Sequence, residues 1–229
     1  MPRWFTPLPF VLPVPAALLV LTSCVGNSTT DAGPAQDTGP FSTISTEVKD
    51  ASSAPAASVL LIRAHVTHDG SAELGAAVKF TVAAGHGVLS VDSTATDTLG
   101  VATVLWTLGD TASEVNKLAI VSGDGIDTLH VVAVAGSPSY LIPITATASD
   151  VAAGAPLTAQ VRVTDRPGNS VAGATVFWLT TGGTLSSASS LTDTNGIASV
   201  TFSASQAGSF TVSAVLPETA TRDFQITVH

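Results

Sequence analysis

Two stretches of this chain repeat each other and decide its fold. Thr96–Trp106 reads TDTLGVATVLW, and Thr192–Phe202 reads TDTNGIASVTF, at a constant offset of 96. In both stretches a turn-forming Gly follows the Asp, and apolar residues then alternate with small or polar ones. Alternation of this kind after a turn is typical of a half-buried β-strand. The stretches therefore predict two copies of one β-rich domain.

Three further pairs of matching motifs surround these stretches. Their offsets vary between 96 and 98, and the changes fall between motifs, where loops absorb insertions. The pairs are HVT at 65–67 with RVT at 162–164, GAAVKF at 75–80 with GATVFW at 173–178, and GVLS at 87–90 with GTLS at 183–186. We therefore expect one domain over residues 43–136 and a second over residues 137–229, with the boundary near Gly136-Ser137-Pro138.

The second copy predicts short strands separated by turns. Leu157, Ala159, Val161 and Val163 share one strand face. Asp165–Asn169 contains the Pro and Gly of a turn. Further along, Val176 and Trp178 face inward, Asn195-Gly196 forms a tight turn because both residue types tolerate positive φ, and strands cover 197–202, 210–215 and 224–228. About seven strands in some 95 residues indicate a β-sandwich.

The composition supports this class and excludes some functions. Hydrophobic residues make up 45% of the 229, charged residues 11% and aromatics 5%. A disordered chain would contain less Val, Ile and Leu, and abundant Thr and Val suit a pleated sheet. The formal net charge is −9. Nucleic-acid binding, which requires Lys and Arg to neutralise phosphates, is therefore not expected.

The second copy resembles a known family, the bacterial Ig-like domain of group 1, which is the stalk module of invasin and intimin. The resemblance spans nearly all of residues 139–229 and is looser over 43–136, where Leu99 replaces the turn Asn and the Asp-x-x-Gly-Asn turn is absent. It implies an all-β chain with two tandem immunoglobulin-like β-sandwiches. The matching segments are 155–157, 161–165, 168–176, 183–185 and 192–198.

The N-terminus predicts export and lipid attachment. A charge at Arg3 precedes the apolar stretch Trp4–Leu21, which is the plan of a signal peptide over residues 1–23. The segment ends in Leu21, Thr22, Ser23 and Cys24, which resembles the bacterial lipobox. That resemblance implies cleavage before Cys24 and a diacylglycerol on its sulfur, so that the membrane is a partner through the lipid.

Two other interpretations of this segment stay open. Cys24 is the only cysteine, so it forms no intrachain disulfide, and a free buried thiol is the first alternative. The second alternative is an uncleaved transmembrane helix, against which Pro7, Pro9, Pro13 and Pro15 argue because each removes a backbone donor.

Residues 24–42 are rich in Gly, Ser, Thr and Pro and predict a flexible tether. In Gram-negative lipoproteins an Asp directly after the cysteine retains the protein in the inner membrane, so Val25 implies outer-membrane sorting if the cell is Gram-negative.

Residues that could carry chemistry form no catalytic pattern. No Gly-x-Ser-x-Gly elbow occurs, and the second copy has no histidine except His229. We expect no enzyme activity and no cofactor. His65 and His68 lie three apart on a strand and so face opposite ways, which disfavours a metal site. Asp97 and Asp193 precede matched turns and predict turn-closing carboxylates rather than calcium ligands. His86 indicates a turn, Asp124 and Asp127 form the densest acidic spot without matching a calcium-loop pattern, and Asp165 by itself indicates no site.

Three aromatic residues allow two interpretations. Trp106, Trp178 and Phe202 could form a sugar-stacking platform, but Trp106 aligns with Phe202 and Trp178 with Phe80. Aromatic exchange at one strand position favours core packing. We therefore expect a lipid-anchored, non-enzymatic stalk in the cell envelope. The alternatives are a surface adhesin that binds a protein or glycan through loops of the second domain, and an accessory carbohydrate-binding module.

Overall fold

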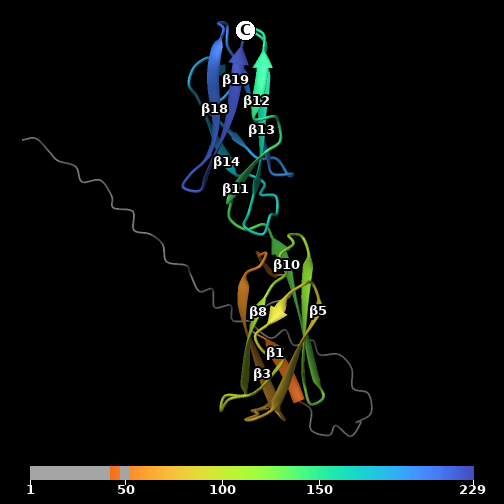
Figure 1. The fold of residues 1–229 in the computed structure, drawn as a ribbon. Coiled ribbons are helices and arrows are strands. Elements are labelled where there is room, and N and C mark those ends of the chain that lie inside the picture. Colours follow the sequence, from red (N-terminus) through yellow and green to blue (C-terminus); the bar gives the residue numbers. More distant parts are fainter. Residues whose placement is uncertain (1–41, 47–51) are drawn as a thin grey trace, which may run out of the picture.

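The computed structural model of this chain describes residues 42–46 and 52–229, and Figure 1 shows them as two β-sandwiches stacked end to end. The described residues form strands, turns and bends. They contain no helix with the length and apolar character needed to cross a membrane. The predicted all-β class, with two tandem sandwiches, is therefore confirmed.

The first sandwich pairs a sheet of order β1-β3-β8-β6, with β4 beside β3, against a sheet of order β2-β10-β9-β5-β7. β2 runs parallel to β10, and the other strand pairs of this sandwich are antiparallel. The strands are β1 (Ser42–Thr46), β2 (Ser52–Pro55), β3 (Val59–His68), β4 (Ser71–Ala72), β5 (Ala77–Ala84), β6 (Val88–Leu89), β7 (Ser93–Ala95), β8 (Val101–Thr107), β9 (Val115–Ser122) and β10 (Gly125–Val134).

The second sandwich repeats this topology. Its sheets have the orders β11-β13-β17-β15 and β12-β19-β18-β14-β16, and β12 runs parallel to β19 as β2 does to β10. The strands are β11 (Tyr140–Pro143), β12 (Ala148–Val151), β13 (Leu157–Thr164), β14 (Thr175–Thr180), β15 (Thr184–Leu185), β16 (Ser189–Leu191), β17 (Ile197–Ser203), β18 (Gly208–Leu216) and β19 (Ala220–Val228).

Each sandwich has its own hydrophobic core between its sheets. Trp106 and Phe80 are buried in the first core, and Trp178 and Phe202 in the second. The predicted inward face of β13 is also correct, because Ala159, Val161 and Val163 are buried while the residues between them are partly exposed. Buried aromatics at matched positions confirm the core interpretation. The sugar-stacking interpretation loses its support.

The repeated turn has the same geometry in both sandwiches. Asp97 Oδ1 accepts the backbone N–H groups of Leu99 at 2.8 Å and of Val101 at 3.0 Å. Asp193 Oδ1 accepts those of Asn195 and Ile197, both at 2.8 Å. Backbone hydrogen bonds from these two N–H groups hold the pKa of Asp97 below its ordinary value of 3.8. The prediction of turn-closing carboxylates is confirmed.

One detail of this turn differs from the sequence prediction. Positive φ occurs at Gly100 (72°) and Gly196 (74°), but Asn195 and Leu99 are not among the non-glycine residues with positive φ. The position before the glycine therefore makes no demand for Asn, because its backbone lies in a region that any residue adopts. For this reason Leu99 occupies the same turn as Asn195 without a change of geometry.

Candidate functional site

The junction between the sandwiches is the most elaborate polar arrangement that the structure describes. The five residues 135–139 connect β10 to β11, and both ends of this connection are hydrogen-bonded. Ala56 N–H donates to Val134 O at 2.8 Å on the side of the first sandwich. Ser139 N–H donates to Thr164 O at 2.8 Å on the side of the second. The connection is therefore anchored to both bodies.

Asp165 organises the second sandwich at this junction. It is 1% exposed and lies in the turn that follows β13. Its Oδ1 accepts the backbone N–H groups of Gly168 at 3.0 Å and Asn169 at 2.7 Å. Its Oδ2 accepts the N–H of Gly136 in the connection at 2.8 Å and the Asn169 Nδ2 group at 3.1 Å. One carboxylate thus fixes the turn, the connection and the Asn169 side chain together.

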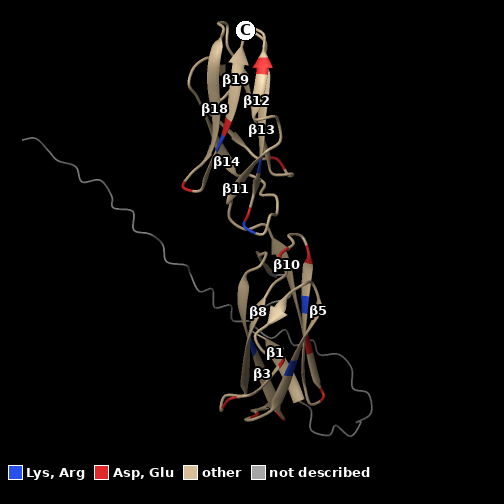
Figure 2. Ribbon diagram, in the orientation of Figure 1, with Lys and Arg blue, Asp and Glu red and all other residues tan. Residues whose placement is uncertain are grey.

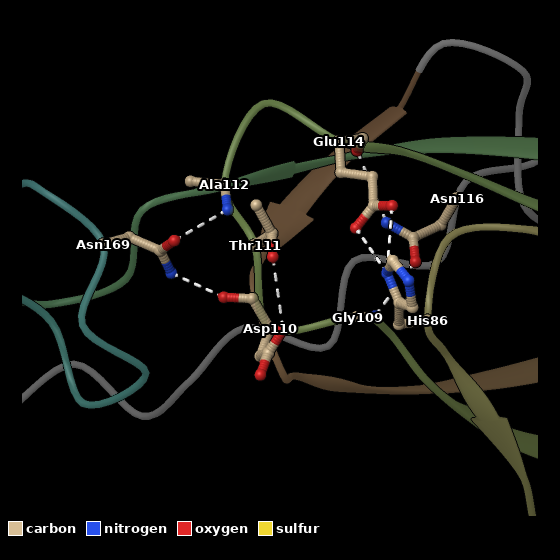
Figure 3. A network of polar contacts seen from close by, with 8 residues as sticks. All are labelled: His86, Gly109, Asp110, Thr111, Ala112, Glu114, Asn116 and Asn169. Carbon is tan, nitrogen blue, oxygen red and sulfur yellow. Dashed lines mark hydrogen bonds and ion pairs between the residues drawn. The ribbon is translucent and has the colours of Figure 1, made fainter.

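Asn169 bridges the two sandwiches, as Figure 3 shows. Its Oδ1 accepts the backbone N–H of Ala112 at 2.8 Å. Its Nδ2 group donates to Asp110 O at 2.8 Å. Both partners belong to the loop between β8 and β9 of the first sandwich. Because the primary amide uses its donor and its acceptor on one loop, it fixes orientation as well as distance. We call Asp165 and Asn169 the junction clamp.

The loop that receives Asn169 is itself held in place. Asn116 is fully buried, and its Oδ1 accepts the Gly109 N–H at 2.9 Å. Glu114 Oε1 lies 3.1 Å from Nδ1 of His86, on the neighbouring loop between β5 and β6 (Figure 3). The buried Asn116 amide and the contact between His86 and Glu114 thus hold the loop in place. The clamp connects two bodies that are each braced where they meet.

Within residues 42–46 and 52–136, the first sandwich has no equivalent of the clamp at the end away from the second sandwich. Thr67 of β3 corresponds to Thr164 of β13, so His68 stands where Asp165 would be. His68 contacts Ser42 Oγ at 3.5 Å and Asp69 at 3.8 Å instead. The Asp-x-x-Gly-Asn turn is therefore present in the one sandwich that follows another described sandwich in this chain. That placement links the motif to the joining of sandwiches.

Sequence reasoning did not find this site. It interpreted Asp165 as an ordinary turn residue. The structure corrects this interpretation, because one of the four N–H groups that donate to Asp165 is that of Gly136, in the segment between the sandwiches. The available signal was the presence of the Asp-x-x-Gly-Asn turn in one repeat and its absence from the other. The contacts of Asn169 with Ala112 and Asp110, which lie 57 and 59 positions away in the chain, have no signature in the sequence.

The other candidate residues lie apart from the junction clamp. Among residues 42–46 and 52–229, no group of three or more His, Cys, Asp or Glu side chains is placed to hold a metal ion. Asp127 accepts a hydrogen bond from Thr46 Oγ1 at 3.0 Å, which ties β10 to β1. The lipobox residues Leu21, Thr22 and Ser23, the cysteine Cys24, the signal peptide 1–23 and the tether up to residue 41 lie outside the described residues.

The charge of Asp165 gives the junction a pH dependence. Burial raises the pKa of this carboxyl, but hydrogen bonds from Gly136, from the Asn169 side chain and from the Asn169 and Gly168 N–H groups outweigh it, so the pKa lies below 3.8. Because the folded-state pKa is lowered, the stabilisation is present above the ordinary pKa and is lost as the pH falls through the folded-state value.

We expect the Gly136 amide resonance to titrate with a midpoint below pH 3.8 in an NMR series from pH 6 to pH 2. In an Asp165→Asn variant this titration should be absent. A Gly136 amide whose resonance titrates in the variant as it does in the parent chain would contradict the assignment of the charge to Asp165.

Comparison with known proteins supports the fold of the second sandwich. Residues 142–229 match the family model of the bacterial Ig-like domain (group 1), and the second sandwich is a domain of this kind. A comparison with curated proteins finds no match. The match covers the clamp as well as the core, so the clamp residues belong to the family-like part of the chain.

Several solved structures resemble both sandwiches together. The D0-D1 domain of intimin is 25% identical with a TM-score of 0.32, covering 82% of this chain and 96% of that one. The D00-D0 domain of intimin is 15% identical with a TM-score of 0.47, covering 82% and 100%. Invasin, a bacterial integrin-binding protein, is 20% identical with a TM-score of 0.40, covering 82% and 40%. All three TM-scores lie below 0.5, so no functional argument rests on them.

Proposed function

We propose that this chain is a non-enzymatic stalk of the cell envelope, in which the junction clamp keeps two sandwiches in line as one stiff rod. The observation that carries the proposal is the bridge from Asn169 to Asp110 and Ala112. A flexible linker would leave the two bodies free to reorient, whereas two directed hydrogen bonds and a buried carboxylate oppose that motion. Each sandwich adds roughly 40 Å to the rod, given about 3.3 Å per strand residue plus loops.

The proposal includes an anchor at the other end. A diacylglycerol on Cys24, after cleavage behind Leu21-Thr22-Ser23, would attach the tether to a membrane. Two acyl chains suffice for stable anchoring, whereas one gives only marginal binding. We place the protein outside the cytoplasm, on the outer membrane or cell surface if the cell is Gram-negative. The sequence motif and the single cysteine support this part of the proposal.

Stiffness of the junction can be measured directly. In a Cys24→Ser background, we would place spin labels on Lys117→Cys and Gln225→Cys, which lie on different sandwiches, and measure their distance distribution by pulsed EPR. The Asn169→Ala variant should show a broader distribution, because the lost bridge stabilises alignment by about 1–2 kcal/mol. The matched control is Asn195→Ala, an exposed residue whose turn is held by hydrogen bonds to Asp193 within the second sandwich. An equally narrow distribution in both variants would count against a clamped rod.

Intact-mass measurement of the membrane-extracted protein tests the anchor. We expect a polypeptide beginning at residue 24 with added acyl groups, and a Cys24→Ser chain that lacks them. Identical, unlipidated masses for the two chains would refute the anchor and leave the rod unaffected.

A surface adhesin is the second candidate, and one observation favours it. Phe177 and Leu179 are exposed on the outer face of β14, where β5 of the first sandwich carries Lys79 and Thr81. Because only the second sandwich has apolar side chains at these positions, the fold of a sandwich does not require them. Exposed apolar clusters are frequent at binding surfaces. Screening of the purified chain and a Phe177→Lys/Leu179→Thr variant against matrix proteins and glycans separates the candidates. Absence of binding at high protein concentration would rule out the adhesin and leave the stalk as the remaining candidate.

A further inference from the structure

The free end of the first sandwich carries three large aliphatic side chains that its counterpart lacks. Leu74 is 67% exposed, Leu99 is 71% exposed and Ile126 is 74% exposed. By strand register and motif alignment, the second sandwich has Ala172, Asn195 and Thr221 at these positions. The fold therefore does not require aliphatic residues there. We call Leu74, Leu99 and Ile126 the foot.

Leu74 and Leu99 lie in loops and Ile126 is the second residue of β10, at the same end of the first sandwich. Thr96 Oγ1 donates to Glu73 O, and Gly75 N–H donates to Thr96 O at 3.0 Å, so the segment with Leu74 lies against the turn with Leu99. Ser42, the first residue of β1, pairs with His68 at the start of that segment. Ser42 also lies against Gly123 and Gly125 in the hairpin that leads to Ile126. The foot thus lies at the end where the described chain enters the first sandwich.

We propose that the foot contacts the lipid bilayer to which the tether is attached, so that the rod stands with its second sandwich outward. This inference rests on the proposed lipid anchor. Residues 25–41 separate Cys24 from Ser42, and a chain of that length spans at most roughly 65 Å. The anchor therefore keeps the foot close to the bilayer, and tethering makes even a weak contact frequent through its high effective concentration.

The charge around the foot selects the kind of bilayer. Asp69, Glu73, Asp97 and Asp124 lie on the same loops, and Figure 2 shows acidic segments at this end of the first sandwich. Carboxylates are repelled by anionic headgroups over about a Debye length. The aliphatic side chains are thus the attractive element, and the contact should be stronger on zwitterionic than on anionic vesicles. On anionic vesicles it should strengthen as salt is added.

Depth measurement by EPR tests this contact. The lipidated chain would carry a nitroxide at Leu99→Cys and be reconstituted in phosphatidylcholine vesicles, with Asn195→Cys as the matched control at the same turn position of the second sandwich. We expect the label at position 99 to gain collisions with oxygen and lose collisions with a water-soluble nickel chelate, while the label at position 195 stays in water. Adding Leu74→Ala and Ile126→Thr introduces the residue types that the second sandwich has at these positions. These substitutions should return the label at position 99 to water.

The possible outcomes separate the foot from the anchor. A lipidated chain, confirmed by mass, whose label at position 99 is as water-exposed as that at 195 would overturn the foot and leave the anchor intact. An unlipidated chain whose label at 99 nevertheless enters added vesicles would support the foot and overturn the anchor. Absence of both lipid and insertion overturns both. A label at 99 that inserts equally with and without Leu74→Ala/Ile126→Thr would show insertion by the label alone, and would also overturn the foot.

Discussion

Replacing Asp165 with alanine is expected to lower the free energy of unfolding of the second sandwich by about 3–5 kcal/mol. The carboxylate is 1% exposed and accepts four N–H groups, from Gly136, from Gly168 and two from Asn169. Alanine removes the acceptor, so the part-buried backbone N–H groups of Gly136, Gly168 and Asn169 lose their carboxylate partner. A buried donor left unsatisfied costs more than a hydrogen bond gains.

The matched control for this change is Asp193→Ala. Asp193 also accepts two backbone N–H groups, but its turn is exposed, so water replaces the lost acceptor. We expect a loss of about 1 kcal/mol or less there. Urea unfolding of both variants, followed by the NMR resonance of the Trp178 indole N–H, measures the difference. Equal losses for the two substitutions would show that Asp165 acts only as a turn residue and not as the centre of the junction.

Gly183→Ala is the second substitution with a large expected effect. A Cβ at Gly183 would lie 2.6 Å from Cε2 of Phe202 and 2.8 Å from Ser203 O, and the backbone has φ of +72°. Neither the buried ring nor the backbone of β17 has room to move. Positive φ costs alanine about 1 kcal/mol, and overpacking adds about 1–3 kcal/mol. We expect a total loss of about 3 kcal/mol in the unfolding free energy.

Gly173→Ala separates the two causes. Gly173 has nearly the same backbone conformation, with φ of +71°, but a Cβ there meets nothing within 4 Å. This variant should therefore show only the conformational cost of about 1 kcal/mol. The difference between the two variants measures the clash with Phe202. If Gly183→Ala is no less stable than Gly173→Ala, the packing of β17 against this bend is looser than the structure indicates.

The repeat alignment predicted the cores because core packing follows a local rule. Alternation along β13 and the exchange of aromatics between Trp106 and Phe202 are visible in the sequence, since a sheet with one face inward requires them. The Asp before the matched turn was predicted for the same reason: its partners lie two and four residues ahead. Sequence reasoning overstated only the role of Asn195, because positive φ occurs at Gly196 alone in that pair.

The two all-β sandwiches, their turns and their aromatic cores are predictable from local sequence patterns, because each pattern involves residues close together in the chain. The role of Asp165 and Asn169 and the grouping of Leu74, Leu99 and Ile126 depend on the tertiary fold. The clamp partners lie far apart in sequence, and their meeting depends on how one sandwich sits on the other. The foot residues come from two loops and from the start of β10. Contacts across such separations follow from chain topology, which no local periodicity records.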